Sequence, residues 1–301
     1  MMWLVAALML ADSTPKSLKV VLSAAETLHV EQRGMGEPVV LIPGLFGSTY
    51  SFRNIAPLLN ESGYETFTIE PLGIGESSKP PTADYSLGAQ ARRVAAVLDT
   101  LGVHHAIVLA HSVGGSEAFR LAYLRPDLVG ALISIEGGPA ETAATPQFKR
   151  AMKYAHWIKW LGGVRLIRWQ IRKMLAASSG NPSWVTEEVV EGYTAPAARD
   201  LDGTLKAFLG IAASKERDRL APHLSELRCP VVVMVGGAPH EGDVSSAEIE
   251  QLRNSIPQIA IDTVPGAGHF IHEEQPAAVM AAVRRTAQAL NVGVMGNTAD
   301  P

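Results

Sequence analysis

The chain has 301 residues, of which 47% are apolar, and its 26 basic and 30 acidic side chains give a formal net charge of −4. This composition is typical of a globular protein and excludes intrinsic disorder, collagen and a coiled coil. A slightly acidic total also argues against a nucleic-acid binder, which needs basic residues to displace phosphate counterions. The single cysteine, Cys229, excludes an internal disulfide and a zinc site made of several thiolates.

The first eleven residues, MMWLVAALMLA, are uncharged and apolar, and they have the length of the hydrophobic part of a signal peptide. No Lys or Arg precedes them, and Met9 and Ala11 make a poor cleavage site. We therefore expect a docked or frayed N-terminal segment over 1–17 and a cytoplasmic protein, with export as the alternative. No other stretch approaches the roughly 18 apolar residues of a membrane span.

Short β-branched runs alternate with amphipathic stretches along most of the chain. This alternation predicts a mostly parallel sheet with helices on both faces. The predicted strands are 18–22, 26–32, 38–42, 65–69, 105–110, 131–135, 231–235 and 259–264. The predicted helices between and after the later strands are 90–101, 115–124, 247–255 and 276–290.

The pattern from about 137 to 227 is helical only, with breaks at two glycine-containing turns. We interpret this stretch as a helical cap inserted between the sixth and seventh strands. The expected α/β core is then formed by 18–136 and 228–292, followed by a short tail over 293–301.

A serine follows the fifth predicted strand directly, in the sequence Ala110-His111-Ser112-Val113-Gly114, and a helix starts after it. This is the pattern of a nucleophile elbow, in which a sharp strand-to-helix turn exposes the serine hydroxyl. Small residues two before and two after the serine let the neighbouring backbone pass close by. We therefore predict that Ser112 is a nucleophile.

A histidine follows the eighth predicted strand through a glycine-rich turn, Gly266-Ala267-Gly268-His269. A serine hydroxyl is a poor nucleophile without an adjacent base, and imidazole exchanges protons near neutral pH. We predict that His269 is this base. His272 could join it on a metal only with a third ligand nearby, and we expect no metal there.

The third predicted strand ends in the loop Pro43-Gly44-Leu45-Phe46-Gly47. Together with the elbow, this loop can supply two backbone N–H groups, from Leu45 and Val113, to the oxyanion of a tetrahedral intermediate. We also expect Phe46 and His111 to line the substrate pocket.

At this point the sequence resembles the α/β-hydrolase superfamily, from about 18 to 290. Supporting segments are Glu70-Pro71-Leu72-Gly73-Ile74-Gly75-Glu76-Ser77 and the run from His272 to Pro276 after the predicted base. The resemblance implies the α/β-hydrolase fold with a cap after strand six, and no cofactor or metal. Two positions depart from the usual pattern, because Pro43 replaces a histidine and Glu70 replaces an aspartate.

The acid of the expected Ser-His-acid triad does not follow the usual pattern. Relatives usually carry it after strand seven, where this chain has Pro239 at the expected position. Glu136, at the end of strand six, is our first candidate, because strands six and seven should be neighbours and a strand end holds a side chain rigidly. Asp243 and Glu241 remain alternatives. Whichever carboxylate serves would orient the histidine and stabilise its cationic form.

These residues predict a serine hydrolase, of carboxylesterase or lipase type, that cleaves a small-molecule ester through an acyl-enzyme. Since residue 112 is Ser and not Asp, an alkyl-enzyme route to epoxide opening is disfavoured. Two alternatives remain open. One is a carbon–carbon bond hydrolase that uses the same triad, and the other is a non-catalytic binding protein of the same fold.

The cap carries eight basic and no acidic residues between Lys149 and Lys173. Trp157, Trp160, Leu161 and Val164 have the spacing of one helical face, so we predict that Trp157 and Trp160 form the roof of the substrate pocket. The alternative is a basic amphipathic lid that contacts an anionic lipid surface.

Overall fold

A computed structural model of the chain describes residues 14–158, 161–241, 244 and 246–297. All eight predicted strands are present, each within two residues of its predicted bounds. They are β1 (Lys16–Val21), β2 (Thr27–Arg33), β3 (Glu37–Ile42), β4 (Tyr64–Glu70), β5 (Ala106–His111), β6 (Val129–Ile135), β7 (Val231–Gly236) and β8 (Ile259–Val264).

The strands form one sheet in the order β1-β2-β4-β3-β5-β6-β7-β8. β2 runs antiparallel to β1 and β4, and all the other pairs are parallel. The carboxyl ends of β3 and of β5 to β8 therefore lie at one edge of the sheet. In open α/β sheets this edge is where ligands bind.

Helices cover both faces of the sheet, as the alternating pattern predicts. α2 (Leu87–Leu101) and α3 (Val113–Leu124) bury their apolar residues against one face. α1 (Ala56–Glu61) and α11 (Pro276–Asn297) cover the other face. α11 continues through part of the predicted tail, so the tail expected from residue 293 onward is partly helical. α9 (Ser246–Ser255) and the short α10 (Ile271–Glu274) flank β8.

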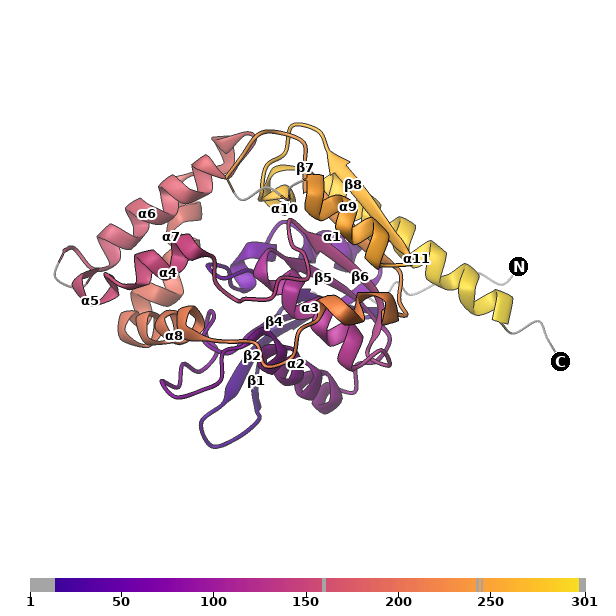
Figure 1. The fold of residues 1–301 in the computed structure, drawn as a ribbon, viewed down its shortest axis with the longest axis horizontal. Helices are drawn as coiled ribbons and strands as arrows, with labels where there is room; N and C mark the ends of the chain where they lie inside the picture. The colour runs from indigo at the N-terminus through magenta and orange to yellow at the C-terminus, as the bar shows by residue number, and fades with distance from the viewer. Residues whose placement is uncertain (1–13, 159–160, 242–243, 245, 298–301) are drawn as a thin grey trace, which may run out of the picture.

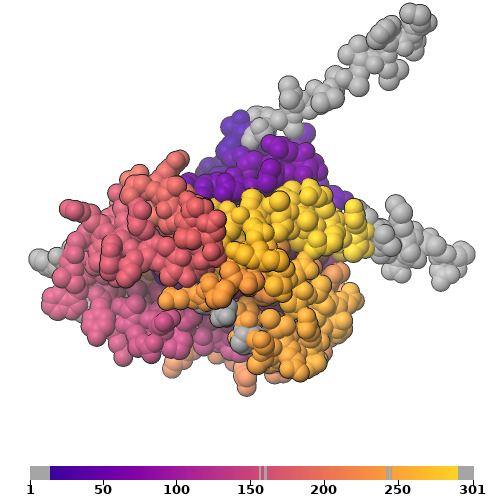
Figure 2. Space-filling view, turned by 90° about the horizontal axis from the view of Figure 1, so that it is seen from above, coloured from indigo at the N-terminus to yellow at the C-terminus, as the bar shows by residue number. Residues whose placement is uncertain are grey.

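Most of the helical elements between β6 and β7 form the cap, which Figure 1 shows grouped at one side of the molecule. The cap consists of α4 (Pro146–Met152), α5 (Ala155–Ile158), α6 (Val164–Ala177), the 3-10 helix η2 (Pro182–Trp184), α7 (Glu187–Arg199) and α8 (Leu201–Ala213). The 3-10 helix η3 (Ala221–Glu226) completes this stretch and contacts α3 of the core, whereas η1 (Thr49–Phe52) lies between β3 and β4. Figure 2 shows the cap, in pink and red, meeting the C-terminal segments of the core, in orange and yellow. The predicted helical insertion after strand six is confirmed.

The helical face predicted over 157–164 is wrong. α5 ends at Ile158, and α6 begins only at Val164. Gly162 and Gly163, with φ values of 128° and 55°, form the break between the two helices. These backbone conformations suit glycine, which has no Cβ, and they end any continuous helical stripe.

No helix in the described part of the chain is both long and apolar enough to cross a membrane. The apolar segment that begins the sequence lies outside the described residues, and β1 starts at the end of the segment predicted over 1–17.

Candidate active site

Ser112 lies in the sharp turn between β5 and α3, with φ 54° and ψ −123°. Positive φ is uncommon for a residue with a Cβ and costs on the order of 1–3 kcal/mol. Hydrogen bonds on both sides hold this conformation: the Ser112 N–H donates to the Ile135 carbonyl at 2.9 Å, and the Gly115 N–H donates to the Ser112 carbonyl at 2.9 Å. The turn presents Ser112 to a cavity of about 610 Å³.

Two glycines allow the loop after β3 to approach this turn. A Cβ added at Gly114 would lie 2.6 Å from the Pro43 carbonyl oxygen. One added at Gly44 would lie 3.2 Å from the Ser112 Cβ. The close approach brings Leu45 and Val113, the two predicted oxyanion donors, to the wall of the same cavity.

His269 reaches the same cavity from the turn after β8. Its backbone N–H donates to the Ser178 carbonyl of the cap at 2.7 Å, and its carbonyl accepts from Nε2 of His111 at 3.0 Å. The rings of His111 and His269 are 4.9 Å apart. Burial, together with the neighbouring His272 and His269, holds the pKa of His111 well below its usual range. His111 is therefore a neutral hydrogen-bond donor that ties the histidine turn to the serine turn.

Glu136 lies directly after β6, and it too has a positive φ, of 49°. Its buried carboxylate accepts from the Gly236 N–H through Oε1. Oε2 lies 3.6 Å from Nδ1 of His269. This separation is longer than a hydrogen bond, and triad contacts often shorten only when substrate binds. The structure thus brings together the three residues predicted as nucleophile, base and first-choice acid.

The other two candidates for the triad acid are Glu241 and Asp243. Glu241 is exposed and lies at the edge of the cavity. Asp243 lies outside the described residues. The loop after β7 contributes a residue that the sequence analysis missed: His240, whose buried Nε2 lies 3.3 Å from Oε2 of Glu136. The loop has no sequence motif that marks this histidine, and its contact with Glu136 depends on the pairing of β6 with β7.

The predicted pocket residues Phe46 and His111 line the cavity. The prediction for Trp157 is not met, because its side chain is 52% exposed and lies away from the cavity wall. Trp160 lies outside the described residues. The cap instead contributes Phe148 and Met174 to the wall, and Phe148 packs edge-on against Phe46 with ring centroids 5.9 Å apart.

A second cavity of about 460 Å³ lies next to the first, beneath the cap helices α4, α6 and α8. It is lined largely by apolar side chains, and it shares Leu45, Phe46, Phe148 and Met174 with the first cavity. These shared residues form the wall between the two spaces.

The basic charge of the cap is partly balanced by the cap itself. Arg168 of α6 lies 3.4 Å from Glu191 of α7, and Arg172 pairs with Glu187. Lys173 lies over the ring of Trp169, 4.8 Å from its centroid. Part of the positive charge of α6 is therefore neutralised by ion pairs with α7, which the sequence of α6 alone does not show.

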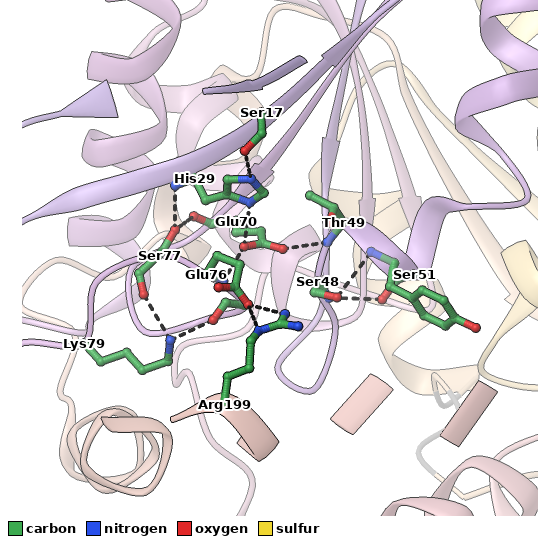
Figure 3. A network of polar contacts seen from close by, with 12 residues as sticks. Ser17, His29, Ser48, Thr49, Ser51, Glu70, Glu76, Ser77, Lys79 and Arg199 are labelled. Carbon is green, nitrogen blue, oxygen red and sulfur yellow. Dashed lines mark hydrogen bonds and ion pairs between the residues drawn. The ribbon is translucent and has the colours of Figure 1, made fainter. Parts of the chain in front are cut away.

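Glu70 holds the loop after β3 in place through hydrogen bonds, which Figure 3 shows together with its neighbours. Its fully buried carboxylate accepts from the Thr49 N–H at 2.7 Å, from the Glu76 N–H at 2.6 Å and from Nδ1 of His29 at 3.0 Å. One carboxylate therefore joins β2 to the loops after β3 and β4.

Several known proteins are similar to this chain. A family model described as "alpha/beta hydrolase fold" matches residues 37–159. The sn-1-specific diacylglycerol lipase ABHD11 of Mus musculus is 27% identical over 259 residues, which is 81% of this chain and 79% of the relative.

Two solved structures share the fold. The epoxide hydrolase CorEH has a TM-score of 0.78 at 22% identity, with 92% of this chain and all of the other covered. A thermophilic esterase from Thermogutta terrifontis has a TM-score of 0.73 at 24% identity, with 91% and 99% covered. The chain therefore has the α/β-hydrolase fold, and its sequence is similar to that of hydrolases in the α/β-hydrolase superfamily.

Proposed function

We propose that this protein hydrolyses carboxylic esters through an acyl-enzyme on Ser112. One observation carries the proposal: Ser112, held at a positive φ after β5, shares a cavity with His269, whose Nδ1 lies 3.6 Å from the Glu136 carboxylate. Nucleophile, base and orienting acid in this relation are the arrangement that activates a serine hydroxyl.

In the first half of the reaction, Oγ of Ser112 attacks the ester carbonyl carbon while Nε2 of His269 takes the hydroxyl proton. The carbonyl oxygen becomes an oxyanion, to which the backbone N–H groups of Leu45 and Val113 donate. His269 then protonates the departing alcohol as the C–O bond breaks. Glu136 stabilises the positive charge that His269 carries between these two proton transfers.

In the second half, a water molecule enters the space left by the alcohol. His269 takes one of its protons, and the hydroxide attacks the acyl carbon. The same two N–H groups stabilise the second oxyanion, and the bond to Ser112 breaks when His269 returns the proton to Oγ. The carboxylic acid then leaves, and the serine is regenerated.

The cavities favour an ester with an apolar acyl part. The second cavity is lined largely by side chains without charge, such as Phe148, Leu205 and Phe208, and hydrocarbon gains free energy by leaving water for such a space. The mouse relative named as a diacylglycerol lipase is consistent with this class of substrate.

A panel of p-nitrophenyl esters of graded acyl length tests the proposal. We expect hydrolysis by the wild type, and a loss of about 10⁴-fold or more in kcat for Ser112→Ala, because the nucleophile is removed. Ser183→Ala, which changes an exposed serine in η2, is the matched control and should keep the parent rate.

Hydrolysis by Ser112→Ala at the parent rate would show that the assignment is wrong. A wild type that leaves every ester intact but cleaves a vinylogous diketone would favour the carbon–carbon bond hydrolase instead.

A further inference from the structure

Three side chains that can ligate a metal lie together beside the proposed catalytic site. They are Glu136, His240 and His269, from the segments that follow β6, β7 and β8, and their nearest ligand atoms all lie within 4.8 Å of one another. Within the described residues, no other group of three or more His, Cys, Asp or Glu side chains is this close. His240 has no part in the proposed reaction, so its presence needs a separate explanation.

The hydrogen bonds of His240 show which atom faces Glu136. Nδ1 lies 2.7 Å from the Ala238 carbonyl oxygen, and a carbonyl only accepts, so Nδ1 carries a hydrogen. In neutral His240, Nε2 then has a lone pair, and this lone pair faces Oε2 of Glu136 at 3.3 Å. Two acceptors at this distance need an electropositive atom between them, either a proton or a metal cation.

His269 adds a third donor atom to this place. Its Nδ1 is buried and has no hydrogen-bond partner among the described residues. It lies 3.6 Å from the same carboxylate oxygen. Two imidazole nitrogens and one carboxylate oxygen thus converge on one place, and of the three atoms only Nδ1 of His269 has no hydrogen-bond partner.

The ligand types identify the class of metal. Two imidazoles and a carboxylate form a ligand set that Zn²⁺ uses in proteins, whereas Ca²⁺ and Mg²⁺ prefer oxygen ligands alone. Ligands about 2.1 Å from a tetrahedral Zn²⁺ lie about 3.4 Å from one another. The separations of 3.3 Å and 3.6 Å from Oε2 of Glu136 are close to this value, and the two histidine nitrogens lie within 4.8 Å of each other.

The surroundings also suit a metal site. Two of the three side chains are held in orientation by further hydrogen bonds. Nδ1 of His240 donates to the Ala238 carbonyl, and the Gly236 N–H donates to Glu136. The side chains of Glu136 and His240 are fully buried. Glu136 and His269 nevertheless border the 610 Å³ cavity, which provides an entry path and room for water as a fourth ligand.

We propose that Glu136, His240 and His269 form a binding site for Zn²⁺ or a similar transition-metal ion, and that this ion inhibits the hydrolase. The proposal departs from the expectation that the chain binds no metal. A neutral imidazole that binds metal through Nδ1 carries its hydrogen on Nε2, so His269 can no longer take the proton of Ser112. Only this inhibitory half rests on the proposed function.

Zinc binding is tested first without catalysis, on the full-length Ser112→Ala chain titrated with ZnCl₂ in a calorimeter. We expect one Zn²⁺ per chain, and binding at least 10-fold weaker when His240→Gln is added, because a ligand is lost. His223→Gln is the matched control. This exposed histidine also lies beside a carboxylate, Glu226 at 2.7 Å, and its loss should leave the affinity unchanged.

Absence of Zn²⁺ binding by the Ser112→Ala chain would overturn the site, as would equal affinity in the chain that also carries His240→Gln. X-ray absorption on the zinc-loaded wild type gives a readout that needs no foldable His240 variant. Two imidazole ligands are expected there, and fewer than two would also overturn the site.

Inhibition is tested second, with an ester that the wild type hydrolyses. We expect Zn²⁺ to abolish turnover, EDTA to restore it, and the zinc concentration for half-inhibition to rise at least 10-fold in His240→Gln. Full turnover at saturating Zn²⁺ would overturn the inhibitory half. A chain that binds Zn²⁺ but hydrolyses no ester would overturn the proposed function and leave the metal site standing.

Discussion

Ser112 and Glu136 share an unusual backbone feature. Both have a positive φ although neither is glycine, and both directly follow neighbouring parallel strands, β5 and β6. Their N–H groups bond to the next strand, Ser112 to Ile135 and Glu136 to Met234, each at 2.9 Å. The sheet therefore holds two strained residues at its carboxyl edge. Strain of about 1–3 kcal/mol per residue is characteristic of functional sites, and here both strained residues are proposed members of the catalytic triad.

The identity of the acid is testable at the same scale. Glu136→Gln keeps the shape of the side chain but removes the charge that stabilises the cationic His269, so we expect kcat to fall about 10³- to 10⁴-fold. Glu241→Gln changes an exposed carboxylate at the cavity edge and should alter kcat less than about threefold. Steady-state ester hydrolysis with EDTA present measures both. A larger loss for Glu241→Gln than for Glu136→Gln would reverse the assignment.

At the scale of elements, the position of the loop after β3 depends on residues of β4 and β2, which are distant in the sequence. Its proposed oxyanion donor, Leu45, lies four residues before Thr49, whose N–H donates to Glu70 on β4. Glu70 in turn accepts from His29 on β2. The glutamate that replaces the family's usual aspartate thus reaches three partners at once, which keeps the loop beside the serine turn.

The pairing of His29 with Glu70 predicts a pH dependence of stability. The hydrogen bond to Glu70 raises the pKa of His29 above its ordinary value of 6.5. A raised histidine pKa means that the pair stabilises the folded state fully below pH 6.5 and ceases to do so as the pH rises through the folded-state pKa. The free energy of unfolding lost in His29→Gln should therefore be larger at pH 5.5 than at pH 9, by roughly 1–3 kcal/mol.

Urea denaturation at both pH values measures this difference. The exposed His104, changed to Gln, serves as the control, and the difference between its losses at the two pH values should be smaller than that of His29→Gln. A loss in His29→Gln that is equal at the two pH values, or larger at pH 9, would contradict the account of this pair.

On the scale of the whole molecule, the cap and the core share the site. The His269 N–H donates to the carbonyl of Ser178 at the end of α6, and the Asn181 N–H donates to Glu274 at 2.8 Å. The turn that carries the proposed base is thus attached to the cap as well as to the sheet. The cap also supplies Phe148 and Met174 to the cavity wall, so it contributes to both the shape and the alignment of the site.

Much of this arrangement could be predicted from the sequence, because strands with β-branched residues and sharp glycine turns leave local patterns. The positions of Ser112 after β5 and of His269 in the turn after β8 could be predicted for this reason. Trp157 was misplaced because two glycines with positive φ break the helix after it. His240 was missed because its contact with Glu136, across 104 residues of chain, depends on the pairing of β6 with β7 and on the path of a loop that has no motif.

The most direct measurement is covalent labelling of the intact protein by a fluorophosphonate, followed by mass spectrometry of its peptides. If Ser112 is activated by His269, the reagent should modify Ser112 rapidly and at one site, and His269→Gln should slow the reaction by about 10³-fold or more. A chain that stays unmodified, or one in which Ser112 reacts equally fast without His269, would contradict the central claim.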